Sequence, residues 1–170
     1  MNALNIVLLI TGLTSALIAG LFYSYSCSVN PGLGQLSDIH YLSAMQAINK
    51  AIINPIFFLS FMGTLFLLPV STYMHYGSAH SSRFYFLLAA TIIYVVGAFG
   101  VTMMGNVPLN DALEKFNIAG ASAQELAAQR LQFEKPWNNL HFVRTVASVL
   151  SLVLVLIGCL QTVAPAKSMD

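Results

Sequence analysis

Residues 137–160 read WNNLHFVRTVASVLSLVLVLIGCL, and Arg144 is the one charged side chain in this stretch. A transmembrane helix needs about 20 mostly apolar residues to cross a hydrocarbon layer roughly 30 Å thick. The stretch is therefore predicted to span a membrane. Most of its polar residues lie in 137–145, so one end of the span differs chemically from the rest.

Three further stretches, 4–27, 55–76 and 84–104, are also long and apolar enough to cross a membrane. The chain of 170 residues is 57% hydrophobic and 8% charged, whereas soluble domains carry roughly 25% charged residues. Strands would leave unpaired edges in lipid, and the chain lacks the alternating pattern of a membrane barrel. We therefore predict an all-α integral membrane four-helix bundle, forming a single domain over residues 1–163 with a flexible tail at 164–170.

The connections between the spans are unequal: the one at 77–83 is short, and those at 28–54 and 105–136 are long. Both long connections leave the predicted bundle on the same membrane face. In the first of them, apolar residues recur at three- and four-residue spacing. This spacing predicts an amphipathic helix over 38–53, with Ser37 as its N-cap.

The second long connection carries start and stop signals for two helices. Asn110 can cap a short first helix, and Ser122 with Glu125 forms a capping box for a second one that should end at about Glu134. Pro136 suits the first turn of the fourth span, where its missing N–H costs nothing. The bundle is thus expected to carry two amphipathic loop helices on one face.

Charge and cysteine usage narrow the classes of function. The net charge is +1 and the chain has no run of Lys or Arg, so no nucleic-acid partner is expected. Cys27 and Cys159 should lie on opposite membrane faces, beyond the roughly 7 Å reach of a disulfide.

The first apolar run is longer than a signal-peptide core, and no Asn-x-Ser/Thr glycosylation site is present. We expect a multi-pass protein of the bacterial inner (plasma) membrane.

The fourth span has a polar face. Trp137, His141 and Arg144 follow one another at three- and four-residue spacing, which places them on one side of the helix. An ionisable side chain that faces lipid costs about 2.5–3.5 kcal/mol, so this side is expected to face the protein interior and to be functional. Plainer interpretations stay open: Arg144 could snorkel to lipid headgroups, His141 could bridge two helices, and Trp137 could belong to an interfacial aromatic belt.

Four asparagines, Asn30, Asn54, Asn106 and Asn110, stand at the same end of the predicted bundle. Asn30 and Asn54 each precede a proline, which disfavours helical backbone in the residue before it. Both are expected to be extended, with amides free to bond exposed backbone or a ligand. Turn formation and capping would explain each asparagine singly, whereas their convergence with the polar face of the fourth span favours a site.

Four motifs, in order along the chain, resemble the anthrone oxygenase-like family of small four-helix membrane proteins. They read YSYSCSVNPGL (23–33), YLSAMQAINKAIINP (41–55), FGVTMMGNVPLN (99–110) and FEKPWNNLHFVRT (133–145). The resemblance implies an oxygenase that uses O₂ to convert a ring methylene of an anthrone-type polycyclic phenol into a quinone carbonyl. The anion of such a substrate is electron-rich enough to react with O₂ without a metal, so O₂ is the co-substrate and no cofactor is expected.

Such an enzyme needs a base, a group that stabilises an anion, and a flat apolar pocket. Our hypothesis assigns His141 as the base, Arg144 and Asn106 as stabilisers of the developing oxyanion, and Trp137 as a stacking wall. Asn30, Asn54 and Asn110 are predicted to contact the substrate. The expected partners are membrane lipid and a hydrophobic aromatic small molecule.

Two competing classes of function remain. A non-enzymatic bundle would bind a lipid or a quinone-like ligand, or would serve as an accessory subunit of a membrane complex. The second competing class is a protein with a metal or haem site, because four-helix bundles often hold cofactors between their helices. His40 and His141 could share one face, but His75 and His80 belong to the other, and no Glu-x-x-His or His-x-x-x-His pair exists. No metal site is therefore predicted.

Overall fold

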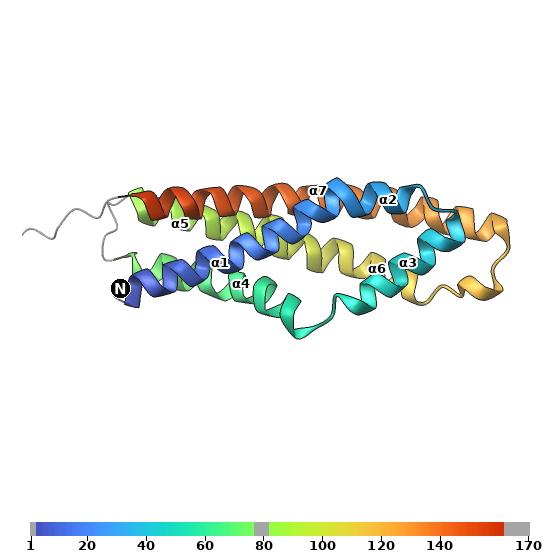
Figure 1. Cartoon of the computed structure of the whole chain (residues 1–170), viewed down its shortest axis with the longest axis horizontal. Helices are drawn as coiled ribbons and strands as arrows, with labels where there is room; N and C mark the ends of the chain where they lie inside the picture. The colour runs from blue at the N-terminus through green and yellow to red at the C-terminus, as the bar shows by residue number, and fades with distance from the viewer. Residues whose placement is uncertain (1–2, 77–81, 162–170) are drawn as a thin grey trace, which may run out of the picture.

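The computed structural model describes residues 3–76 and 82–161, and the ordered elements within these residues are all helices (Figure 1). In chain order they are α1 (Ala3–Ser24), the π-helix η1 (Tyr25–Val29), α2 (Asn30–Gly34), α3 (Asp38–Ala51), α4 (Pro55–Met74), α5 (Ser82–Ile93), the π-helices η3 (Tyr94–Gly100) and η4 (Thr102–Asn106), α6 (Val107–Glu114), the 3₁₀-helix η5 (Ile118–Gly120) and α7 (Ala123–Leu160). The tail predicted at 164–170 lies outside the described residues, as does most of the connection at 77–83.

Four continuous helical stretches among the described residues are long and apolar enough to cross a membrane: Ala3–Gly34, Pro55–Met74, Ser82–Glu114 and Ala123–Leu160. The predicted fold class, an all-α integral membrane bundle, is confirmed. The second stretch has 20 residues, which matches one hydrocarbon layer. The other three have 32, 33 and 38 residues and are therefore about 48 to 57 Å long at 1.5 Å per residue. This length exceeds what one hydrocarbon layer requires, so we expect these helices to extend beyond the membrane.

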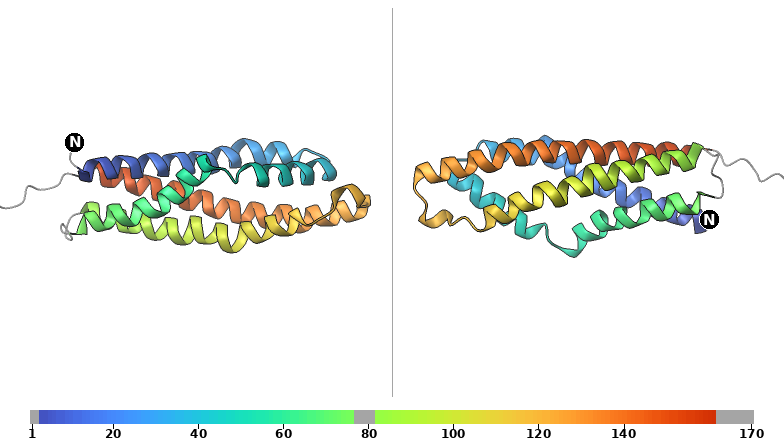
Figure 2. Two further views of the ribbon diagram at one scale, coloured as in Figure 1. Left: turned by 90° about the horizontal axis from the view of Figure 1, so that it is seen from below. Right: turned by 180° about the vertical axis from the view of Figure 1, so that it is seen from behind.

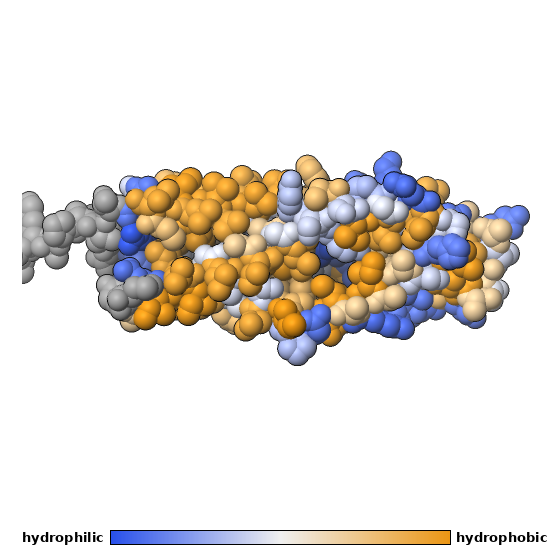
Figure 3. All heavy atoms as spheres, in the orientation of Figure 1, coloured by the Kyte–Doolittle hydropathy of each residue, from blue (hydrophilic) through white to orange (hydrophobic). Residues whose placement is uncertain are grey.

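The bundle is accordingly divided along its long axis into two halves (Figure 2). One half, which we call the membrane half, contains most of α1, α4, α5 and the C-terminal part of α7. The extramembrane half contains α2, α3, α6, η5 and residues 123–136 of α7. In Figure 3 hydrophobic side chains cover nearly all of the membrane half, whereas hydrophilic side chains gather over the other half.

The first and third spans continue beyond their predicted ends at 27 and 104, because π-helical turns carry the chain past two prolines. Asn30 has helical backbone angles, φ −59° and ψ −46°, so its predicted extended conformation is wrong. A proline ring collides with the carbonyl four residues earlier in an α-helix. In η1 the N–H of Asn30 instead bonds the carbonyl of Tyr25, five residues back, and this wider turn precedes Pro31. The same arrangement in η4 precedes Pro108, so Asn110 lies inside α6 and does not cap a helix.

The predicted loop helix at 122–134 and the fourth span form one helix, α7, which contains Pro136 in its interior. Separate helices were expected because an interior proline removes one hydrogen bond. Phe133 and Trp137, on either side of Pro136, are both buried in one apolar cluster, and this packing holds the helix together. The capping box of Ser122 and Glu125 at its start is confirmed.

Two other local predictions are confirmed. α3 covers Asp38–Ala51, close to the predicted 38–53. Asn54 is extended, with φ −141° and ψ 160°, and its side chain accepts a hydrogen bond from the N–H of Phe57 at 3.0 Å. It therefore caps α4 and fixes where the second span begins.

Close contact between the third and fourth spans depends on glycine. A Cβ added at Gly97 would lie 2.7 Å from the Cβ of Ala147, which has no flexible end that could move away. Gly97→Ala is therefore expected to lower the free energy of unfolding by about 1–3 kcal/mol, because helix backbones would have to separate. Gly20→Ala is the matched control, since nothing lies within 4 Å of a Cβ there. Unfolding midpoints of both variants are measured in detergent micelles. Equal midpoints for Gly97→Ala and Gly20→Ala would contradict the prediction.

Candidate functional site

A cavity of about 460 Å³ lies where the membrane half meets the extramembrane half, within the size range of small-molecule sites. α1 with η1, the α3–α4 connection, η4 with α6, and α7 all contribute to its lining. Its lining includes aromatic, apolar and charged side chains, among them Phe22, Tyr25, Lys50, Ile53, Phe57, Phe58, Phe61, Thr102, Met103, Asn110, Asp111, Glu114, Trp137, His141 and Arg144. Its buried residues form an inner end, and its exposed residues form a mouth.

Arg144 occupies the inner end and is only 9% exposed, so it does not snorkel to the headgroups. Its guanidinium carbon lies 4.4 Å from the ring centre of Phe22 and 5.1 Å from that of Trp137. Nη1 approaches Thr102 Oγ1 at 3.5 Å. Among the described residues no carboxylate lies within salt-bridge distance of this cation. A buried charge without a counter-ion is costly, and such an arrangement is typical of a site for an anionic ligand.

His141 holds this cation in place. Arg144 Nε donates to His141 Nδ1 at 3.1 Å, so Nδ1 is an acceptor and carries no hydrogen. His141 Nε2 lies 2.9 Å from Ser26 Oγ and 3.2 Å from the carbonyl oxygen of Phe22, which can only accept. Ser26 Oγ itself donates to that same carbonyl. Nε2 therefore carries the hydrogen, and both ring nitrogens are engaged.

Aromatic rings form two walls of the cavity. The Trp137 ring stacks on His141, with 5.0 Å between ring centres and an interplanar angle of 9°. Tyr25 lies 5.6 Å from Trp137. Phe57 and Phe61 of α4 are stacked on each other at 5.1 Å and supply a second aromatic surface. Trp137 is 3% exposed and is therefore not an interfacial belt residue. The cavity offers flat apolar surfaces of the kind that a fused-ring compound requires.

The mouth of the cavity combines charged and lipid-facing side chains. Lys50 of α3 and Glu114 of α6 form an ion pair of 2.8 Å there. Ile53 of the α3–α4 connection, Phe58 of α4 and Met103 of η4 are 69%, 43% and 46% exposed. The mouth therefore presents apolar side chains at the surface close to where the second candidate span begins.

Of the four asparagines predicted to belong to the site, one lines the cavity and three do not. Asn110 lines the cavity, and its Oδ1 accepts a hydrogen bond from Trp137 Nε1 at 2.8 Å. Asn106 is buried behind the wall, where Nδ2 donates to the carbonyl of Trp137 at 3.2 Å. Asn54 Nδ2 donates to the carbonyl of Ala51, and neither Asn54 nor Asn30 lines the cavity. The structure thus brings Trp137, His141, Arg144 and Asn110 into one site, with Asn106 fastening η4 to α7.

Several functional residues were not selected from the sequence. Ser26 and Thr102 lie in η1 and η4, and Phe57 lies in the first turn of α4. π-Helical turns rotate the residues that follow them relative to an α-helix, so a three- and four-residue pattern misplaces them. The signal that could have found these turns is a proline, Pro31 or Pro108, that follows each π segment without ending the helix.

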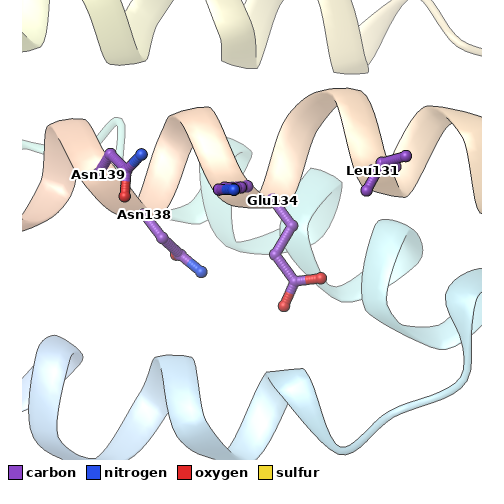
Figure 4. A pocket seen from close by; sticks show the side chains of 5 residues that line it. Leu131, Glu134, Asn138 and Asn139 are labelled. Atoms are coloured by element: carbon purple, nitrogen blue, oxygen red, sulfur yellow. The ribbon is translucent and has the colours of Figure 1, made fainter.

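A second cavity of about 290 Å³ lies on another side of α7 and is lined by Leu131, Glu134, Lys135, Asn138 and Asn139. Figure 4 shows Glu134 and Asn138 directed to the same side of the helix. Glu134 is bonded to Arg130 at 2.7 Å, and Arg130 also bonds Asp38 and the carbonyls of Gly34 and Leu36. These contacts join α7 to the α2–α3 connection, so this region has a structural explanation.

Among the described residues no group of three or more His, Cys, Asp or Glu side chains could hold a metal ion. His40 is paired with Ser37, and His75 bonds the carbonyl of Ser71 at the far end of α4. His80 lies outside the described residues. The cavity itself contains a single histidine.

Comparison with protein families matches residues 57–154 to the family described as Anthrone oxygenase. The matched segment begins in α4 and contains Trp137, His141 and Arg144, whereas Tyr25 and Ser26 precede it. No curated protein and no solved structure matches the chain. Because the matched residues make up more than half of its length, this integral membrane protein belongs to the anthrone oxygenase family.

Proposed function

We propose that the protein is an oxygenase that uses O₂ to convert the ring methylene of an anthrone-type polycyclic phenol into a quinone carbonyl. The observation that carries the proposal is a buried arginine that has no carboxylate partner among the described residues, at the inner end of a cavity walled by flat aromatic rings. The protein would act in the bacterial inner membrane, on a hydrophobic substrate that enters from the lipid side of the mouth.

The reaction begins with removal of a methylene proton, which leaves the electron pair of that bond in the ring system. The resulting anion carries its charge largely on the carbonyl oxygen, and Arg144 is placed to stabilise that oxygen. A fixed donor of this kind is worth about 3 kcal/mol. The ring carbon then gives electrons to O₂ and forms a hydroperoxide after taking up a proton. Loss of water from the hydroperoxide yields the new carbonyl, so one oxygen atom enters the product and the other leaves as water.

His141 supports this chemistry by orienting Arg144. Its acceptor nitrogen is occupied by Arg144 Nε, and its other nitrogen faces Ser26 and the carbonyl of Phe22. In this arrangement its contribution is to fix the guanidinium with the terminal nitrogens toward the cavity. The role of base that the sequence analysis gives to His141 stays a prediction, which requires Arg144 to release Nδ1.

Incubation of the purified protein with an anthrone under ¹⁸O₂ tests the proposal. We expect quinone absorbance to appear faster than in a protein-free control, with one ¹⁸O atom in each quinone. The control is needed because an anthrone anion also reacts slowly with O₂ in water. Saturable binding of the anthrone without accelerated oxidation would contradict the enzymatic proposal and favour a non-catalytic protein that binds quinone-like ligands.

A further inference from the structure

One carboxylate at the cavity differs from the others in the described part of the chain. Asp38 and Glu134 are paired with Arg130, Glu114 with Lys50, and Glu125 with the N-terminus of α7. Asp111 lines the cavity and has no ion-pair or hydrogen-bond partner among the described residues. A free carboxylate beside an apolar cavity is available to accept a proton.

Asp111 and Arg144 both line the cavity, Asp111 as an exposed residue and Arg144 as a buried one. Asp111 belongs to the exposed mouth, next to Asn110, whose Oδ1 bonds the indole nitrogen of Trp137. Arg144 follows Trp137 by seven residues along α7 and is buried at the inner end. Its guanidinium carbon lies 5.1 Å from the centre of the Trp137 ring, so this ring is a neighbour of both Asn110 and Arg144.

One charged group at the buried end of the cavity and another at its exposed mouth suit the proposed substrate. In an anthrone the carbonyl carbon and the methylene carbon occupy opposite positions of the central ring. The group that binds the carbonyl oxygen and the group that removes the methylene proton must therefore lie on opposite sides of the substrate. His141, bonded to Arg144 Nε at 3.1 Å, lies on the same side as Arg144. Asp111 makes no ion pair with Arg144 and belongs to the exposed mouth.

We propose that Asp111 is the general base of the reaction. The proton moves from the methylene carbon to the Asp111 carboxylate, while the C–H electron pair enters the ring system and its charge reaches the oxygen beside Arg144. Water at the mouth then takes the proton and restores the carboxylate. This inference rests on the proposed function and names the residue that performs its first step.

The proton transfer can be measured apart from oxidation. An anthrone deuterated at its methylene is incubated with the protein in lipid nanodiscs without O₂, and loss of deuterium to water is followed by mass spectrometry. We expect the native protein to accelerate exchange and Asp111→Asn to slow it by about 100-fold or more, the usual contribution of a positioned base. Asp111→Glu should recover part of the rate. Asp38→Asn, the same chemical change away from the cavity, should exchange like the native protein.

Substrate binding is monitored separately by fluorescence, because Trp137 is the only tryptophan in the chain and lies in the cavity wall. Asp111→Asn is expected to retain quenching of Trp137 by the anthrone, which shows that the variant is folded and binds. Native exchange rates in Asp111→Asn, or a larger loss in Glu114→Gln or His141→Gln, would overturn the assignment of the base. If the native protein itself neither binds the anthrone nor exchanges its deuterium, the proposed function fails.

Discussion

Anthrone oxidation should fall by roughly 10²- to 10³-fold in Arg144→Met, the loss typical of removing one oxyanion donor. Methionine keeps the length and the apolar contacts with the rings of Phe22 and Trp137, but it removes the cation. The thermal midpoint should stay equal or rise, because the substitution removes a buried charge to which residues 3–76 and 82–161 offer no carboxylate partner. Activity and stability are thus expected to change in different directions. Quinone formation and thermal unfolding in detergent measure the two effects.

Arg83→Met provides the matched comparison at the other end of the bundle. Arg83 Nε donates to the carbonyl of Gly158 at 2.9 Å, and Nη2 donates to that of Gln161. These bonds satisfy carbonyls at the C-terminus of α7, so their loss should lower the thermal midpoint while activity per folded molecule is retained. If Arg144→Met lost stability as Arg83→Met does and kept its activity, Arg144 would be a structural residue and the anion site would not exist.

His141→Phe is expected to reduce oxidation by about 100-fold. Phenylalanine can still stack on Trp137, but it offers no acceptor to Arg144 Nε, so the guanidinium loses its fixed orientation. His141→Gln should recover much of the activity, because a side-chain amide oxygen can accept the same hydrogen bond. The comparison uses kcat for oxidation together with Trp137 quenching for binding.

The two His141 variants also separate the possible roles of this residue. A glutamine can position Arg144 but cannot take a proton from a C–H bond. Equal loss in His141→Gln and His141→Phe would therefore favour His141 as the base, as the sequence alone predicts. Recovery in His141→Gln alone supports the positioning role.

The same dipeptide, Asn-Pro, shows where local prediction succeeds and where it fails. At Asn54 the chain is extended and the asparagine caps α4, as the proline rule predicts. At Asn30 the chain remains helical, because the preceding π-helix bonds its N–H to the carbonyl five residues back. The rule describes the proline and its neighbour only, and it takes no account of a π turn in the residues before them. Pro136 was likewise expected to start a helix and is instead carried within α7 by packing on both of its sides.

The candidate site also has one part that the sequence predicts and another part that it does not. Helical periodicity alone places Trp137, His141 and Arg144 on one face, since they are neighbours on a single helix. The cavity that they border also requires Tyr25 from η1 and Asn110 from α6, which lie far away in the sequence. The order of the spans predicts that Asn110 stands at this end of the bundle, whereas no spacing rule predicts its bond to Trp137 or the contact of Tyr25 with the same ring.

The sequence by itself determined that this protein is an all-α membrane bundle with a polar face on its fourth span, because hydropathy and helical period are local properties of the chain. Only the tertiary structure decided that Arg144 is buried with no carboxylate of the described residues within salt-bridge distance, that His141 bonds it, and that Asp111 lines the same cavity. These features depend on contacts between different helices, such as the 2.9 Å approach of Ser26 to His141 across 115 residues. The packing of helices against one another sets these distances, and they cannot be derived from the sequence of any single segment.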